Sequence, residues 1–257
     1  KYEDLEAKEG IAWTSLNIAR LFKLNTSYDK ALEYLDKSYN LYQQIEKEQG
    51  IKTGVTLCLK EYGLIYAKAG DQEKALEYST AVLERNRKNN NKYGVANALT
   101  NIGKIYFEKA AYDTSLSYLK KALSIKKGLD DQLELPSLLR LMGDNYLQKG
   151  NINLALSYYE RSLQQAKEQH LKNELQQTYY ALSQAYREKQ DYRNAFQYYA
   201  GYSQLKDSLA NQHINELEMQ YEFEKEQEKL KYEQKRQQAI QEAKLKRQKI
   251  ITWAFVV

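Results

Sequence analysis

The sequence is poor in the residues that end helices and form tight turns. Its 257 residues include 11 glycines and a single proline, Pro136, which is too few for the many turns of an all-β protein. We therefore expect long helices. The one cysteine, Cys58, excludes an internal disulfide and a multi-cysteine metal cluster. The two histidines, His170 and His213, lie 43 residues apart, which disfavours most metal-dependent and histidine-dependent chemistry.

The motifs of the common enzyme classes are also missing. The sequence contains no phosphate-binding loop, no nucleophile elbow, no HExxH and no convergent set of histidines and carboxylates. We expect no catalytic residue, no cofactor and no metal site in this chain. The net charge is +5, and residues 222–249, with nine basic and six acidic residues, account for +3 of it. The remaining +2 is too small for a nucleic-acid-binding face, so we expect no nucleic acid to bind here.

A repeat of about 40 residues is the main positive signal. Five similar segments begin at residues spaced by 44, 40, 40 and 40 positions, namely Ile18, Tyr62, Ile102, Met142 and Leu182. The next residue in each unit is small, at Ala19, Gly63, Gly103, Gly143 and Ser183. An aromatic residue follows three positions later, at Phe22, Tyr66, Tyr106, Tyr146 and Tyr186. A second small residue stands thirteen positions after the first residue, at Ala31, Ala75, Ser115, Ala155 and Ala195. This pattern predicts two closely packed antiparallel helices in each unit.

These recurring positions resemble the signature of the tetratricopeptide repeat over roughly residues 9–202. The resemblance implies an all-α, right-handed solenoid of five antiparallel helix pairs, which a long C-terminal helix follows. The period of 40 exceeds the family's usual ~34, and the family's proline near the end of the second helix is missing from every unit. We therefore expect the second helices to run on for about another turn. Pro136 fits the first turn of a helix.

The resemblance also implies a ligand groove lined by the first helix of each pair. Its inward positions lie two before, two after, five after and six after the first residue of each unit. The basic residues that we assign to the groove are Arg20, Lys23, Lys60, Lys104, Arg140 and Arg187. The carboxylate clamp of chaperone-binding members is not reproduced, because Leu64 stands where an asparagine would follow Lys60. Since arginine suits carboxylates and a concave wall concentrates the field, we predict an acidic protein or peptide ligand. The alternative is a set of solvated charges in weak surface ion pairs.

The repeat pattern stops after residue 202. We expect five repeats over 1–202, a capping helix over 203–221, a charged helix over 222–249 and the start of a membrane-spanning helix over 250–257. The last segment has eight uncharged residues, and a complete span needs ~20 apolar residues. The charged helix does not encode a strong coiled coil, so it is either a solvated helix or a weak homodimer contact.

This order of segments resembles the sensor region of membrane-anchored bacterial signalling proteins that are common in the Bacteroidetes. In that family a histidine kinase, a nucleotide cyclase, a PP2C-like phosphatase or a LuxR-type DNA-binding domain follows the membrane helix. The resemblance implies a non-catalytic sensory input region of a signal-transduction protein, anchored in the inner membrane with periplasmic repeats. The basic residues before Ile250 favour a cytoplasmic alternative. A free-standing scaffold or adaptor that assembles other proteins is the other open function.

Overall fold

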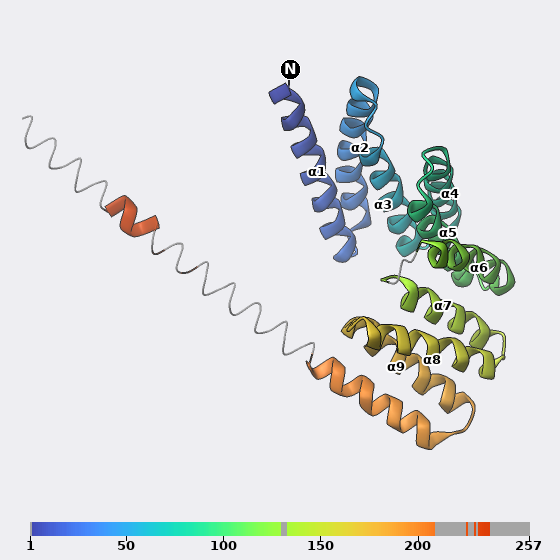
Figure 1. Cartoon of the computed structure of the whole chain (residues 1–257). Coiled ribbons are helices and arrows are strands. Elements are labelled where there is room, and N and C mark those ends of the chain that lie inside the picture. Colours follow the sequence, from blue (N-terminus) through green and yellow to red (C-terminus); the bar gives the residue numbers. More distant parts are fainter. Residues whose placement is uncertain (1, 130–132, 209–224, 226–228, 230, 237–257) are drawn as a thin grey trace, which may run out of the picture. The chain divides into compact units, whose positions relative to one another are not determined.

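The computed structural model describes residues 2–129, 133–208, 225, 229 and 231–236 (Figure 1). The chain divides into two compact units, Lys1–Tyr202 and Ser203–Val257. Every regular secondary-structure element among the described residues is helical. The architecture below is that of the first unit.

Helices of this unit follow one another as antiparallel pairs (Figure 1). The first helices of the pairs are α1 (Tyr2–Leu24), α3 (Thr53–Ala69), α5 (Lys92–Glu108), α7 (Leu135–Gln148) and α9 (Lys172–Glu188). Their partners are α2 (Tyr28–Gln49), α4 (Gln72–Lys88), α6 (Tyr112–Gly128) and α8 (Ile152–Glu168), and residues 192–202 are helical and follow α9. The all-α solenoid of five helix pairs predicted from the repeat register is confirmed.

The helix lengths add detail to the expectation of long second helices. The helices α3, α4, α5 and α6 each contain 17 residues. In the second and third units the two helices are thus equally long, whereas in the fourth unit α8 has 17 residues and α7 has 14. Pro136 lies in the first turn of α7, as its chemistry predicts.

The two helices of a pair cross where the sequence has its small residues. The second small residue of each of the first four units is fully buried, at Ala31, Ala75, Ser115 and Ala155. A Cβ atom added to Gly103 would lie 2.7 Å from Leu119 Cδ2, and one added to Gly143 would lie 2.5 Å from Tyr159 Cε1. Only glycine fits at these two crossings without movement of a buried side chain.

The recurring aromatic of each first helix stacks on an aromatic of the second helix. The ring centroids lie 5.3 to 5.6 Å apart in the five pairs Phe22–Tyr34, Tyr66–Tyr78, Tyr106–Tyr118, Tyr146–Tyr158 and Tyr186–Tyr198. Such pairs contribute ~0.5–1.5 kcal/mol beyond the area that they bury. Each stacked pair of rings therefore stabilises the packing of the two helices of its unit.

The turns inside the pairs share one backbone conformation. The residue eight positions after the start of each unit has a positive φ, at Thr26 (57°), Gly70 (88°), Ala110 (55°), Gly150 (76°) and Gln190 (63°). The left-handed region is unfavourable by ~1–2 kcal/mol for residues with a side chain. Three of the five turns therefore hold a strained residue, and the sequence alone does not single them out.

Cys58 and His170 have structural positions. Cys58 is fully buried with its Sγ atom 3.4 Å from Ser38 Oγ, and burial raises the pKa of the thiol to about 11. The thiol is thus neutral and shielded at pH 7. His170 is exposed in the turn between α8 and α9, with φ at 55°. His213 lies outside the described residues.

Most of the predicted C-terminal segments also lie outside the described residues. This applies to most of the capping helix over 203–221, to most of the charged helix over 222–249 and to all of 250–257. These segments stay predictions. None of the described helices has both the length and the apolar character needed to cross a membrane.

Candidate functional site

Two of the six predicted groove residues pair with a buried carboxylate. Arg20 Nε donates to Glu61 Oε1 at 2.8 Å, and Lys23 Nζ donates to Glu61 Oε2 at 2.6 Å. Glu61 is only 5% exposed. Burial acts to raise the pKa of the Glu61 carboxyl, but the hydrogen bonds and charges of Lys23 and Arg20 outweigh burial and lower that pKa. These cations therefore join α1 to α3 through Glu61, a residue that the sequence analysis did not identify.

Arg140 is also engaged within the fold. Its Nη2 atom donates to Gln177 Oε1 at 2.7 Å, and its Nη1 atom donates to Asp144 Oδ2 at 3.3 Å. The Tyr159 hydroxyl donates to the other Asp144 oxygen at 2.7 Å. Burial raises the pKa of Asp144, although the charge of Arg140 and the bond from Tyr159 oppose the rise. These groups line a cavity of about 570 Å³ between α7 and α9, and Arg187 is not among its lining residues.

Lys60 and Lys104 lie together on a different cavity. It has a volume of about 300 Å³ and is bounded by α3, α4 and α5, and we call it the α3–α5 hollow. Lys68 also lines it, whereas Glu108 is the one carboxylate among the lining residues. Within the described part of the chain, none of the three lysines makes a hydrogen bond or an ion pair. The hollow thus has a rim of net positive charge, although the charge of Lys104 also acts on Asp144 and helps to oppose the rise of its pKa.

The floor of the α3–α5 hollow is apolar. Its apolar lining residues are Leu64, Ala67, Val82, Ala98 and Ile105. Seen in the repeat register, six lining residues occupy the inward positions of the second and third units, namely Lys60, Leu64, Ala67, Lys68, Lys104 and Glu108. The first helices of these two units thus supply most of the wall.

A single small residue explains why the hollow exists. The position seventeen after the start of each unit is large in four units, at Leu35, Leu119, Tyr159 and Tyr199. The second unit has Ser79 there. A Cβ atom added to Gly63 would lie 3.1 Å from the Ser79 hydroxyl and 3.6 Å from the nearest backbone atoms. Because Gly63 and Ser79 are both small, the space that Leu119 fills against Gly103 in the third unit stays open in the second.

A second cavity continues from the α3–α5 hollow. It has a volume of about 460 Å³ and shares Lys60, Val82, Ala98 and Asn101 with the first. Its lining includes the asparagines Asn86, Asn89, Asn91, Asn97 and Asn101. Within the described residues, the Asn101 amide makes no hydrogen bond. An amide carries both donors and an acceptor, so Asn101 is suited to the backbone of an extended ligand.

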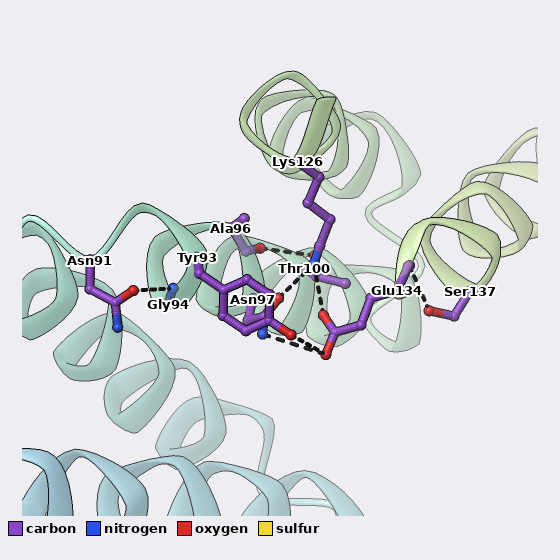
Figure 2. A network of polar contacts seen from close by, with 9 residues as sticks. All are labelled: Asn91, Tyr93, Gly94, Ala96, Asn97, Thr100, Lys126, Glu134 and Ser137. Carbon is purple, nitrogen blue, oxygen red and sulfur yellow. Dashed lines mark hydrogen bonds and ion pairs between the residues drawn. The ribbon is translucent and has the colours of Figure 1, made fainter. Parts of the chain in front are cut away.

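A buried lysine contacts Tyr93 and Asn97, which line this second cavity (Figure 2). Lys126 is 1% exposed and donates to Glu134 Oε2 at 2.7 Å and to Asn97 Oδ1 at 2.8 Å. Its Nζ atom also lies 5.0 Å from the ring centroid of Tyr93. Figure 2 shows how these groups converge from α5, from α6 and from the residue that precedes α7. The network fixes the position of Asn97 and was not foreseen from the sequence.

Comparison with known families agrees with this geometry. A tetratricopeptide repeat model matches residues 55–128, and a second model with the same description matches residues 139–169 and 176–207. Together the matches cover just over half of the chain. The chain belongs to the tetratricopeptide repeat family. Tetratricopeptide repeats are interaction modules with a typically non-catalytic fold, so a role in binding protein follows.

Solved structures with the same fold come from several kinds of tetratricopeptide repeat protein. The Rap conjugation gene regulator of the plasmid pLS20, solved in complex with the Phr* peptide, has a TM-score of 0.68 and 17% identity, over 77% of this chain and 54% of the regulator. A signal transduction ATPase with a tetratricopeptide repeat sensor from Pyrococcus horikoshii has a TM-score of 0.66 and 21% identity, over 82% of this chain and 32% of that protein. BtubC from P. vanneervenii has a TM-score of 0.57 and 18% identity, over 80% of this chain and 92% of BtubC. No curated protein matches the sequence. At these identities the tetratricopeptide repeat structures share the fold alone with this chain.

Proposed function

We propose that the chain is a non-catalytic protein-interaction region that binds an acidic protein or peptide segment at the α3–α5 hollow. The observation that carries this proposal is the set of three lysines, Lys60, Lys68 and Lys104, which line an apolar floor without an ion pair to any described residue. Three lysines and one carboxylate, Glu108, leave the hollow with a net positive charge, and a concave surface concentrates that field and attracts an acidic ligand. Lys60 and Lys104 are the members of the predicted groove that this proposal retains.

Three of the remaining predicted groove residues have a weaker claim to a ligand. Arg20 and Lys23 are compensated by Glu61, and Arg140 is compensated by Asp144. A peptide ligand is also supported by the Rap proteins of similar fold, which were solved with the Phr* peptide and with the competence and sporulation factor. Those ligands belong to the Rap proteins, and here they support only the peptide class.

The test is capture of binding proteins from the native host, identified by mass spectrometry. The double variant Lys60→Glu/Lys104→Glu is compared with Lys88→Glu/Lys120→Glu, whose lysines are exposed on α4 and α6 and make no hydrogen bond to a described residue. The two variants change the net charge equally. We expect the first variant to lose the captured proteins and the second to retain them. Equal capture by both variants would contradict a binding role for the hollow.

We further propose that the region is the sensory input of a bacterial signal-transduction protein, anchored in the inner membrane through residues 222–257. This rests on the order of repeats, charged helix and apolar segment in the sequence. The repeats would be periplasmic, with the cytoplasm as the alternative, and the charged helix would relay the signal through a homodimer. A ligand shifts such a relay only if it binds two arrangements with different affinity. An enzymatic effector domain would follow in the full-length protein.

Cell fractionation separates this proposal from the free-standing scaffold. The chain is expressed through the natural end of its gene, and the membrane and soluble fractions are probed. We expect the protein in the membrane fraction, whereas recovery in the soluble fraction favours the scaffold. Two glycines inserted after Gln237 would interrupt the charged helix. Signal output that survives this insertion would contradict the relay while leaving the anchor in place.

A further inference from the structure

We infer that the α3–α5 hollow is a specificity pocket for one aliphatic side chain of the acidic ligand segment. This inference deepens the proposed function and rests on it. The occupant is a peptide segment with one leucine, isoleucine, valine or methionine that is flanked by aspartate or glutamate. The ligand would supply the side chain that the second repeat lacks.

The size of the pocket follows from the repeat comparison. In the third unit Leu119 is fully buried against Gly103, and the equivalent space in the second unit lies open between Gly63 and Ser79. Two units related by the same register thus differ by about one aliphatic side chain. A leucine from a ligand can occupy the place that Leu119 fills in the third unit. Burial of that side chain on an apolar floor is favourable because it removes apolar surface from water.

The polar groups around the pocket define what flanks the aliphatic side chain. Lys60, Lys68 and Lys104 supply positive charge on the rim, which favours carboxylates on either side of the anchor. The side-chain oxygen of Gln72 also lines the hollow, and this buried atom accepts no hydrogen bond in the described structure. An unpaired buried acceptor is unfavourable until a donor reaches it. A backbone N–H of a bound peptide is such a donor, whereas a simple anion is not.

The rim also distinguishes a peptide from a free fatty acid or another small carboxylate. Asn101 lies on both this hollow and the adjoining cavity, and its amide makes no hydrogen bond to a described residue. Together with Gln72 it can satisfy the backbone of an extended chain that crosses the rim. Several carboxylates spaced along one chain match three separate lysines better than a single carboxylate does.

The test begins with selection of peptides from a random twelve-residue library on the full chain. We expect the enriched peptides to share one aliphatic residue with at least two acidic residues within two positions of it. The affinity of an enriched peptide is then measured by fluorescence polarisation for the wild type, for Ser79→Leu and for Ser79→Ala. The leucine fills the pocket, as Leu119 does in the third unit, whereas the alanine leaves it open. We expect at least tenfold weaker binding to Ser79→Leu and binding within twofold of wild type for Ser79→Ala.

A change in the peptide provides a test that is independent of protein folding. Replacement of the aliphatic residue of the peptide by serine is expected to weaken binding to the wild type at least tenfold. Selection that enriches no peptide, or peptides without the aliphatic and acidic pattern, would overturn the inference. Binding that is lost in Lys60→Glu/Lys104→Glu but kept in Ser79→Leu would overturn the pocket and leave the proposed function standing. Binding that survives both variants would overturn both.

Discussion

Three glycines at equivalent crossings should respond differently to the same substitution. The changes are Gly63→Ala, Gly103→Ala and Gly143→Ala. In the first variant the new methyl group lies 3.1 Å from the Ser79 hydroxyl and 3.6 Å from the nearest backbone atoms. In the other two it lies 2.7 Å or less from carbon atoms of buried Leu119 or Tyr159. The change in the backbone is thus the same at the three sites, whereas the contacts that the new methyl group makes differ between them.

The expected magnitudes follow from two opposing terms. Alanine is more favourable than glycine in a helix interior by ~0.8–1 kcal/mol. Overpacking of a filled core is unfavourable by ~1–3 kcal/mol. Tyr159 cannot move easily, because it is fully buried and its hydroxyl donates to Asp144. We therefore expect Gly63→Ala to be neutral or stabilising by up to ~1 kcal/mol, and Gly103→Ala and Gly143→Ala to be destabilising by up to ~2 kcal/mol.

Urea unfolding followed by circular dichroism at 222 nm measures these differences. Repeat proteins can unfold in several steps, so the midpoints of all three variants are compared with the wild type under one set of conditions. We expect the midpoint to rise or stay unchanged for Gly63→Ala and to fall for the other two. Equal shifts in all three would refute the crossing geometry and, with it, the explanation of the α3–α5 hollow.

Three further substitutions test separate features of the fold. The pKa of the Glu61 carboxyl is lowered in the folded chain. Its pairing with Arg20 and Lys23 therefore stabilises the fold at pH values above the unfolded carboxyl pKa of ~4.3. This stabilisation is lost as the pH falls through the lower pKa of the folded state. Glu61→Gln should lower the free energy of unfolding by ~1.5–3 kcal/mol at pH 7, and a urea series should show the difference shrinking below pH ~4. Ala110→Gly removes the strain of a φ of 55° and should raise the thermal midpoint of unfolding. The greater conformational freedom of glycine in the unfolded chain offsets ~0.4–1 kcal/mol of this gain. A lower midpoint would argue against a strained turn. Ser79→Leu fills the hollow and should raise the midpoint as well, and a fall would show that the pocket does not admit an aliphatic side chain.

The fold could be predicted because the packing constraint repeats in the sequence. Each helix pair needs small residues at its crossing and an aromatic beside it, so the positions recur every 40 residues and reveal the pairs. The helix lengths could not be predicted in the same way, because no proline or other helix breaker marks most of the helix ends. The strained turn at Ala110 was also hidden, since alanine gives no local sign of a left-handed backbone.

The candidate site could be predicted only in part. Inward positions were assigned from one helix of each unit, and this placed Lys60 and Lys104 on a common surface. The pairing of Arg20 with Glu61 joins residues 41 positions apart, and single-helix spacing does not show such a contact. The sequence did contain a sign of the hollow, because the position seventeen after the start of the unit is Ser79 in the second unit and leucine or tyrosine in the other four. This position lies on the second helix of the unit, whereas the inward positions were assigned on the first helix only.

Photocrosslinking tests most directly whether the α3–α5 hollow holds the ligand. The aliphatic residue of a library-selected peptide is replaced by photoleucine, the complex is irradiated, and the modified residues are identified by mass spectrometry. We predict crosslinks to the residues of the floor, foremost Leu64, Val82 and Ile105. Crosslinks confined to the cavity beside Arg140, or to the outer faces of α4 and α6, would contradict it.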